Sequence, residues 1–198
     1  MSSVPGPADL LAAVIAQFQV AYPEVTVRLF LDEAIVKLEY GVAHVALRAG
    51  APPQEPDNIA QKLMRIGVGL YAAPSYVEQF GLPKDSTQFS AHRFVGHDHA
   101  EHGSPFNRWL RAAVPEERIM TRSNDHDVLE AAVFRGVGIG FADELSRVAH
   151  PDLIEVMEPL DEWAVDLWVV SHVDLHHTAK VQAFLKILKE VTKTWRQI

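Results

Sequence analysis

The sequence predicts an α/β protein of two lobes, each with a mixed, mainly parallel sheet and flanking helices. Three observations support this class. Short runs with strand spacing alternate with amphipathic runs along the chain, the order typical of α/β folds. The run 42–47 is almost continuously apolar, as in a strand covered on both faces. The first and last thirds each supply strands and a long helix, with a smaller α/β unit between them.

The first third alternates helix and strand. Apolar residues at helical spacing indicate a first helix that Pro23 ends, because proline removes a backbone donor. Alternating apolar and polar residues then indicate a strand. The expected elements are a helix over 8–21, a strand over 25–31, a short helix between Asp32 and Gly41, and a strand over 42–47.

The middle of the chain contains shorter elements, separated by proline and glycine. Pro74 suits the first turn of a helix and Gly81 suits its end. Elsewhere polar residues separate the apolar runs. The expected elements are strands over 59–64, 66–72, 93–96, 119–122 and 137–141, and helices over 74–80, from Ser104, and from Asp125 to Gly136.

The last third returns to long elements. Strands are expected over 153–157 and 165–170, and an apolar stripe from Val181 to Trp195 indicates a final helix. We therefore assign residues 1–71 and 160–198 to lobe I and residues 72–159 to lobe II, so the chain crosses between the lobes twice.

Composition excludes several classes of function. The net charge of -8 argues against a surface that binds nucleic acid by itself. The absence of cysteine excludes disulfides and cysteine-based metal or nucleophile sites. The N-terminal segment lacks a basic region and a secretory cleavage site, and no apolar run has membrane-spanning length. We expect a cytoplasmic protein with no membrane partner.

The stretch 121–143 places a polar strand end against the start of a helix. Ser123, Asn124 and Asp125 follow a short strand, and such side chains accept the free amides of a helix's first turn. The same place suits a carboxylate or phosphate, since amides and the helix dipole point at it. Taken alone, the pattern more often reflects a simple helix cap.

Six segments, in this order, resemble the effector-sensing domain of LysR-type transcriptional regulators. They are QFQVAYPEVTVRLFL, GVAHVALRAG, IGVGLYAAPSYVEQFGLP, AHRFVGHD, GVGIGFAD and the ending LWVVSHVDLHHTAKVQAFLKIL. The resemblance spans nearly the whole chain. It implies the type 2 periplasmic-binding-protein fold, two α/β lobes with a small-molecule cleft at their junction, and a bacterial transcription factor that acts as a dimer or tetramer.

Two features depart from the family pattern. Family members carry a winged helix-turn-helix ahead of this domain, and none is expected in this chain. The chain begins at SSVPG, which resembles the loop after the first strand of the sensing domain, so that strand is expected to be missing too. DNA binding is therefore expected only through the absent N-terminal domain.

In open α/β sheets ligands bind at the carboxyl ends of strands, where similar domains hold their effectors. The residues expected to contact the effector are Ser2, Ser3, Arg48, Ala49, Gly50, Gly96, His97, Asp98, Ser123, Asn124, Phe141 and Ala142. Arg48 fits a fork with a carboxylate, or equally a surface ion pair. Phe141 is interpreted as a cleft wall or a core aromatic residue. We expect a small carboxylate or aromatic acid as effector, without a catalytic residue, cofactor or metal.

Two histidine clusters suggest other functions. The string from His97 to His102 resembles the metal-binding signature of metallo-β-lactamase-fold hydrolases, with Glu101 where that pattern has Asp. A zinc-dependent hydrolase is thus one alternative, and a stand-alone solute-binding protein for transport is another. His172, His176 and His177 are interpreted as structural, with Asp174 capping the final helix.

The resemblance also implies a dimer. In similar domains the helix at 8–21 and the strand at 25–31 pack antiparallel against the second lobe of a partner. Tyr22 and Phe30 are expected to stay available at the surface for this contact, the other reading being that both face their own core.

Overall fold

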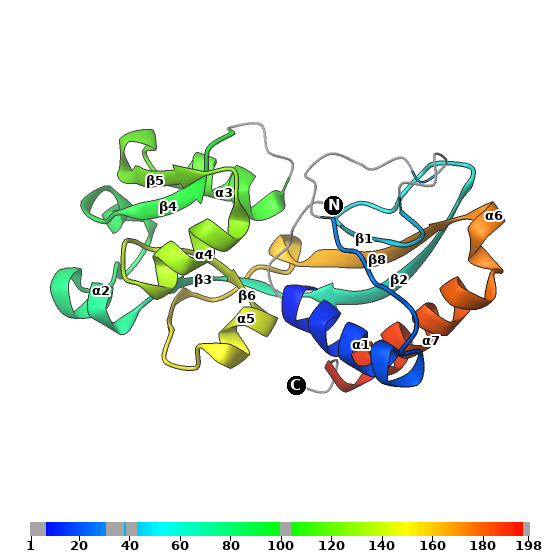
Figure 1. The fold of residues 1–198 in the computed structure, drawn as a ribbon. Helices are drawn as coiled ribbons and strands as arrows, with labels where there is room; N and C mark the ends of the chain where they lie inside the picture. Colours follow the sequence, from blue (N-terminus) through cyan, green and yellow to red (C-terminus); the bar gives the residue numbers. More distant parts are fainter. Residues whose placement is uncertain (1–6, 31–37, 39–42, 100–103, 196–198) are drawn as a thin grey trace. The chain divides into compact units, whose positions relative to one another are not determined.

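A computed structural model describes residues 7–30, 38, 43–99 and 104–195. The chain forms two compact units, Met1–Arg65 with Asp166–Ile198, and Ile66–Val165, called here the first and second unit. Each unit combines helices with strands, which confirms the α/β class (Figure 1). Ser2, Ser3 and the short helix expected between Asp32 and Gly41 lie outside the described residues, apart from Leu38. The division into lobes at residues 71 and 159 stays a prediction.

The first unit is a three-stranded sheet with helices beside it. The sheet order is β1-β8-β2, so its central strand comes from near the end of the chain. β1 and β8 are antiparallel, with Ala46 opposite Val170. The elements are α1 (Pro7–Ala21), β1 (Ala46–Ala49), β2 (Asn58–Ile66), β8 (Val165–His172), α6 (Val173–His176) and α7 (Ala179–Trp195).

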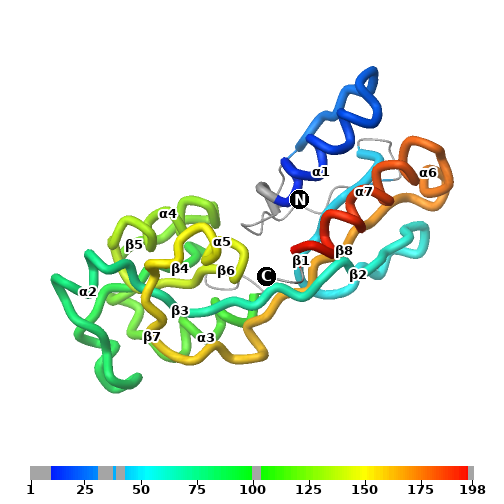
Figure 2. Tube along the Cα trace, turned by 90° about the horizontal axis from the view of Figure 1, so that it is seen from below, coloured from blue at the N-terminus to red at the C-terminus, as the bar shows by residue number. Residues whose placement is uncertain are grey.

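The two long helices of this unit pack on each other, as Figures 1 and 2 show from two sides. Leu10, Val14 and Phe18 recur every four residues on α1 and are all buried. Phe18 meets Phe184 of α7 edge to face, with 5.5 Å between ring centroids. Val14 and Phe18 are two of the residues whose helical spacing predicts a helix over 8–21, and the prediction is confirmed.

The strand predicted over 25–31 is wrong for the residues described. Val25–Phe30 form no strand, and Leu29 and Phe30 are 57% and 47% exposed. Alternating apolar and polar residues indicate a strand only when one face has something to cover it. Here the side chains on both faces are largely exposed, so no described segment of the chain covers the apolar face.

The described part of the second unit has five strands with helices packed against them. Its sheets have the orders β6-β3-β7 and β4-β5, and a bridge between Phe94 and Ile139 links β4 to the residue before β6. The strands are β3 (Val68–Ala72), β4 (Phe94–His97), β5 (Ile119–Ser123), β6 (Gly140–Asp143) and β7 (Ile154–Met157). The helices are α2 (Pro74–Phe80), η2 (Ser86–Ala91), α3 (Pro105–Ala113), η3 (Glu116–Arg118), α4 (His126–Phe134), α5 (Glu144–Ala149) and η4 (Asp161–Trp163).

The sheets are mixed, but they are not mainly parallel as predicted. Among the described pairs whose direction is defined, β4–β5 and the bridge from Phe94 to Ile139 are parallel. The pairs β1–β8, β3–β6 and β3–β7 are antiparallel. The parallel expectation came from helices between successive strands, yet these antiparallel partners are distant in sequence. The handedness rule for adjacent strand–helix–strand units therefore does not govern them.

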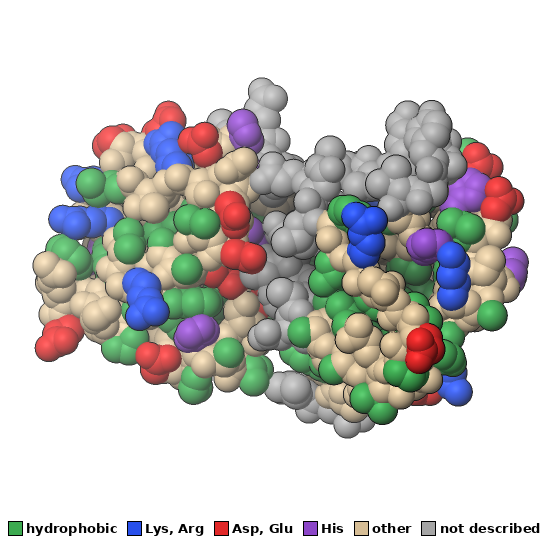
Figure 3. Space-filling view, in the orientation of Figure 1, with side chains coloured by type: hydrophobic (Ala, Val, Ile, Leu, Met, Phe, Trp, Pro, Cys, Tyr) green, Lys and Arg blue, Asp and Glu red, His purple; other side chains and the backbone are tan. Residues whose placement is uncertain are grey.

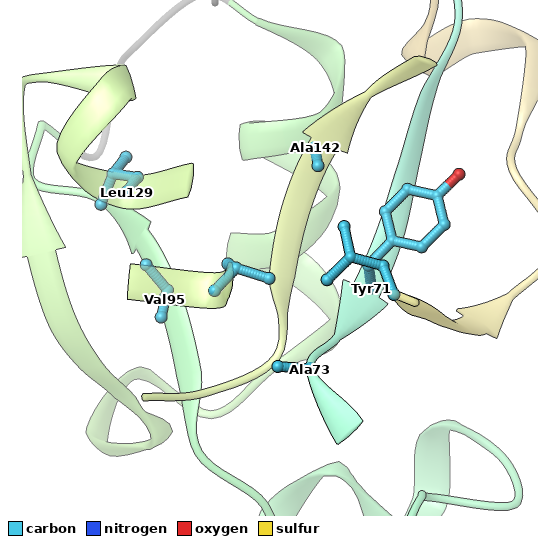
Figure 4. Packing of buried hydrophobic residues seen from close by; sticks show 7 residues of the cluster. Tyr71, Ala73, Val95, Leu129 and Ala142 are labelled. Atoms are coloured by element: carbon cyan, nitrogen blue, oxygen red, sulfur yellow. The ribbon is translucent and has the colours of Figure 1, made fainter. Parts of the chain in front are cut away.

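Helices α3 and α4 pack on opposite faces of β4. Val95 belongs to a buried cluster with Leu129 and Val133 of α4, part of which is drawn in Figure 4. A Cβ added at the neighbouring Gly96 would collide with Leu110 of α3. Successive strand residues point to opposite faces, so this alternation fixes both helices on one short strand.

Trp163 is the centre of an aromatic cluster in the second unit. Its side chain is fully buried. Its ring centroid lies 4.9 Å from that of Trp109 and 5.0 Å from that of Phe141, both close to edge to face. Phe106 extends the cluster through Phe141 at 5.1 Å. Edge-to-face rings at these separations add to the stability from burial alone.

Gly136 closes α4 in the left-handed region, with φ of +75°. A Cβ there would also collide with the hydroxyl oxygen of Ser75. We expect Gly136→Ala to lower the free energy of unfolding by about 1 to 2 kcal/mol, from backbone strain. Ser75 is exposed, and its hydroxyl can rotate away. Chemical denaturation should therefore show that Gly136→Ala lowers the free energy of unfolding by nearly the same amount when Ser75 is also replaced by alanine. Recovery in that double variant would instead assign the loss to the collision.

The surface carries charges of both signs. On the face shown in Figure 3, Lys and Arg side chains lie singly among acidic and apolar ones. No described helix is both long and apolar enough to cross a lipid bilayer.

Candidate functional site

Two strand ends of the second unit form a polar cluster. β4 and β5 run parallel, and His97 is paired with Ser123 at their carboxyl ends. The backbone N–H of Asp98 donates to the Ser123 carbonyl at 3.0 Å, which extends the pairing by one step. Parallel strands end at the same edge of a sheet, which brings His97, Asp98 and Ser123 together.

The start of α4 lies directly behind this cluster. Asp125 caps the helix, its Oδ1 accepting from the N–H groups of Asp127 at 2.9 Å and Val128 at 3.2 Å. The Ser123 hydroxyl oxygen accepts from the Asp125 N–H at 3.0 Å. Burial, and then the Asp125 charge, raise the pKa of Asp127. The Asp125 carboxylate thus binds the backbone N–H groups at which the sequence suggested an external anion. The Ser123 hydroxyl accepts one hydrogen bond, and its own O–H remains able to donate another.

Helix α3 holds the loop after β4. Arg111 Nη2 donates to the His97 carbonyl at 2.6 Å and to the Asp98 carbonyl at 3.2 Å. The buried Asn107 donates from Nδ2 to the His99 carbonyl at 3.5 Å. These two residues were not predicted. Their spacing of four residues on a helix puts them on one face, and that was the available signal.

An imidazole and a phenyl ring lie beside the polar cluster. His126, the first residue of α4, is stacked on Phe106 with a centroid distance of 6.1 Å and an interplanar angle of 25°. Phe106 also contacts Phe141. Phe141 itself is buried among Phe106, Trp109 and Trp163, which matches the core interpretation of this residue. The cluster thus has an aromatic wall next to hydroxyl and imidazole groups.

In the first unit, Arg48 is held in an ion pair. Its Nη1 lies 2.6 Å from Glu55 Oε1. A backbone hydrogen bond and then the Arg48 guanidinium lower the pKa of Glu55. Gly50, next to Ala49 at the end of β1, has φ of +108°; its N–H donates to the Asp166 carbonyl and its own carbonyl accepts from Trp168 Nε1. Arg48 is thus already bound to a carboxylate, the kind of group expected in an effector.

The remaining predicted contacts fall into two groups. Asn124 is exposed between β5 and Asp125, next to the polar cluster. Gly96 and Ala142 are buried, Gly96 against Leu110 and Ala142 in the cluster around Tyr71. The roles of all these residues toward an effector stay predictions.

The histidine strings do not form a metal site in the described part of the chain. No group of three His, Asp or Glu side chains there is arranged to hold a metal ion, while Glu101 and His102 lie outside the described residues. His97 Nδ1 accepts from the His99 N–H at 3.1 Å. His176, buried and bonded to the Ser171 hydroxyl at 2.7 Å, has its pKa lowered by burial. Asp174 does not cap the final helix, since it lies in the first turn of α6, which His172 caps.

The model of the LysR substrate binding domain matches residues 2–193. The chain belongs to the LysR substrate-binding domain family. Such domains are the effector-binding parts of transcriptional regulators, a family that is generally not enzymatic. The zinc-hydrolase and transport alternatives receive no support.

Solved structures show the same fold. The regulatory domain of CrgA, a LysR-type regulator of Neisseria meningitidis, matches with a TM-score of 0.79 and 23% identity, over 95% of this chain and 94% of that one. The effector domain of AmpR of Pseudomonas aeruginosa matches with a TM-score of 0.68 and 18% identity, over 94% and 90% of the two chains. These likenesses confirm the type 2 periplasmic-binding-protein-like fold that the sequence predicted.

Curated relatives are longer than this chain. An HTH-type transcriptional repressor of Pseudomonas aeruginosa (strain UCBPP-PA14) is 26% identical over 194 residues, which covers 92% of this chain and 59% of that protein. An HTH-type transcriptional regulator of Xanthomonas campestris pv. campestris (strain 8004) is 32% identical over 83 residues, 42% of this chain and 24% of that protein. The match thus spans about three fifths of the Pseudomonas relative and about a quarter of the Xanthomonas relative.

Proposed function

We propose that this LysR-family domain senses a small anionic effector, a small carboxylate or aromatic acid, and controls a bacterial transcription factor of the cytoplasm. The observation that carries the proposal is the polar strand-end cluster of His97, Asp98 and Ser123 beside the start of α4. Effector binding would favour one arrangement of the regulator over another, which requires different affinities for the two arrangements. DNA is contacted only by a separate helix-turn-helix domain.

The chemistry of the proposed contacts suits an acid. Arg48 supplies a guanidinium whose planar fork matches a carboxylate. The Ser123 hydroxyl supplies a neutral donor, and the Phe106 ring is the kind of wall that an aromatic acid packs against. Because Glu55 already pairs with Arg48, an effector carboxylate has to replace or share that partner. The site is thus expected to prefer a carboxylate to a neutral guest.

Calorimetric screening of small carboxylates and aromatic acids tests this site. For a ligand found in this way, we expect Arg48→Ala and Ser123→Ala each to weaken binding, Arg48→Ala by about tenfold or more, because a charge-assisted hydrogen bond is lost. Lys62→Ala is the matched control, since Lys62 also pairs with a carboxylate, Asp166 at 2.7 Å. Unchanged affinity in both Arg48→Ala and Ser123→Ala would show that the map of the site is wrong.

We also propose that the domain associates with a second copy of itself. Tyr22 and Phe30 are exposed, as are other apolar residues of the segment that follows α1. On the second unit, Met120 of β5 is 59% exposed and Val128 of α4 is 51% exposed. Two exposed apolar faces on one chain suit an antiparallel pair. In such a pair the face with Phe30 on one copy contacts the face with Met120 on the other, and the reverse contact forms as well. A dimer or tetramer is the expected assembly.

A further inference from the structure

Two carboxyl groups are buried side by side in the second unit, away from the strand-end cluster. Glu130 of α4 is 3% exposed and Asp143, the last residue of β6, is 1% exposed. The Asp143 N–H donates to Glu130 Oε1 at 3.1 Å. Acidic side chains are seldom buried so completely without a cation beside them, because two negative charges without water are very unfavourable.

The pair joins three elements. Glu130 binds the end of β6 through the Asp143 N–H, and Asp143 Oδ1 accepts from the Ser146 N–H at 2.8 Å, which caps α5. The Ser146 side chain hydrogen-bonds to Glu130 as well. Asp143 Oδ2 is buried and has no hydrogen-bond partner among the described residues. Any change in charge here acts on the packing of α4 and α5 against β6.

Among the described residues, the other charged side chains with the largest effects on the pair are acidic. Asp127 on α4 and Glu144 on α5 are further carboxyls that act on it. The Arg147 guanidinium of α5 lies over the ring of Tyr71 of β3, 5.6 Å from the centroid, and Glu155 of β7 also acts on Tyr71. On β4 and β5, which pack against α4 too, His97 accepts from the His99 backbone and Arg122 pairs with Glu116.

Burial, and then the neighbouring Asp143, raise the pKa of Glu130 to about 8. Burial raises the pKa of Asp143 to about 6, against hydrogen bonds from Ser146 and Leu145. Both pKa values lie above those of the unfolded chain, so the folded second unit binds more protons than the unfolded one. The contribution of this pair to stability is therefore fully present below about pH 4 and is lost as the pH rises through 6 and 8.

We propose that the domain responds to pH through the Glu130–Asp143 pair, which holds a proton inside the second unit at neutral pH and releases it, with loosening of α4 and α5, as the pH rises. The signal reaches the strand-end cluster because α4 begins at His126, one turn before Glu130, and Asp125 connects it to Ser123. The proton is then an input separate from any effector, and the proposal does not depend on the effector's identity.

The first test follows the carboxyl carbons of the whole chain by NMR from pH 5 to 9. We expect the Glu130 resonance to titrate near pH 8. Midpoints below pH 5 for both Glu130 and Asp143 would overturn the proposal. The wild-type chain suffices for this measurement, so it does not depend on whether a variant folds.

The second test measures hydrogen exchange at pH 7 and pH 8.5, with rates referred to the intrinsic rate at each pH. We expect amides of α4 and α5 to lose protection by about tenfold for each pH unit below the Glu130 pKa, while those of α7 in the first unit do not. The range above pH 7 is chosen because burial lowers the pKa values of His92 and His176, which confines their opposite effect to lower pH.

Variants assign the effect to the pair. Glu130→Gln and Asp143→Asn keep the shape and an acceptor oxygen but cannot ionise, so we expect each to reduce the pH dependence of α4 and α5 protection. Glu155→Gln, which removes an exposed carboxyl of the same unit, should leave it unchanged. An undiminished pH dependence in a folded Glu130→Gln variant would overturn the proposal.

Discussion

Trp163→Ala is expected to lower the stability of the second unit by about 3 to 5 kcal/mol, the range for removing a fully buried aromatic side chain. The side chain is 0% exposed and packs against Trp109 and Phe141, so its loss leaves a cavity between rings that cannot close it. Chemical denaturation followed by circular dichroism measures the loss. Hydrogen exchange should locate it in residues 66–165, because the three rings all belong to the second unit.

Trp163→Phe is the matched control. It keeps a ring in the cluster, and it removes an indole N–H that is buried without a hydrogen-bond partner among the described residues. We therefore expect Trp163→Phe to cost much less than Trp163→Ala, since no hydrogen bond is broken. Equal losses in the two variants would show that the indole N–H, and not ring packing, accounts for the effect.

Phe30→Glu is expected to weaken self-association by about tenfold or more, because it replaces an apolar ring, which the Arg28 guanidinium overlies at 5.3 Å from the centroid, with a charge that loses water in the contact. Met120→Arg should have a comparable effect from the other face of the proposed pair. Both side chains are exposed, so the fold of the chain itself should not change. Sedimentation velocity over a range of concentrations gives the dissociation constants, and circular dichroism checks the fold.

The two variants combine into a sharper test. If the face of Phe30 meets the face of Met120 on the partner, a chain with both Phe30→Glu and Met120→Arg brings opposite charges together and should recover part of the lost affinity. Val148→Glu is the control, because Val148 is exposed on α5, an element that belongs to neither proposed face. Equal weakening by Val148→Glu would show that added negative charge, rather than the proposed contact, is responsible.

Several helix ends could be predicted from single residues that suit only one position in a helix. Pro74 and Gly81 mark the ends of α2, and Asp125 and Gly136 mark those of α4, because each residue suits one position at a helix end. Residues 25–30 were misread for the opposite reason. Strand spacing tells which face of a segment is apolar, but it does not supply a neighbouring strand or a core.

Whether two strands pair parallel or antiparallel could not be predicted from the spacing of apolar residues. A helix between two strands indicates a parallel pair only when those strands become neighbours. In this protein β3 instead has β6 and β7 as neighbours, and β1 has β8, each more than sixty residues away along the chain. Which distant segments pair depends on how whole layers pack, and short-range spacing carries no such information.

The candidate site was predictable where it lies at strand ends. His97 and Ser123 were each expected at the carboxyl end of a strand, and β4 and β5 place them opposite one another. Asp125 was expected to cap α4, but the sequence does not tell that its carboxylate binds the N–H groups of both Asp127 and Val128, because this depends on local geometry. The Glu130–Asp143 pair gave no signal, since a lone Glu in an amphipathic helix usually faces water.

The order of the first sheet has a consequence for how the protein is made. The second unit is one uninterrupted stretch, Ile66–Val165, inserted between the two parts of the first. The central strand of the first unit, β8, comes after that stretch. On the ribosome, the inserted unit therefore has its full set of strands first, while β1 and β2 wait for β8 and α7 to emerge. Nascent chains that have emerged from the ribosome only as far as residue 165 would then carry a complete second unit and a first unit still open to chaperones.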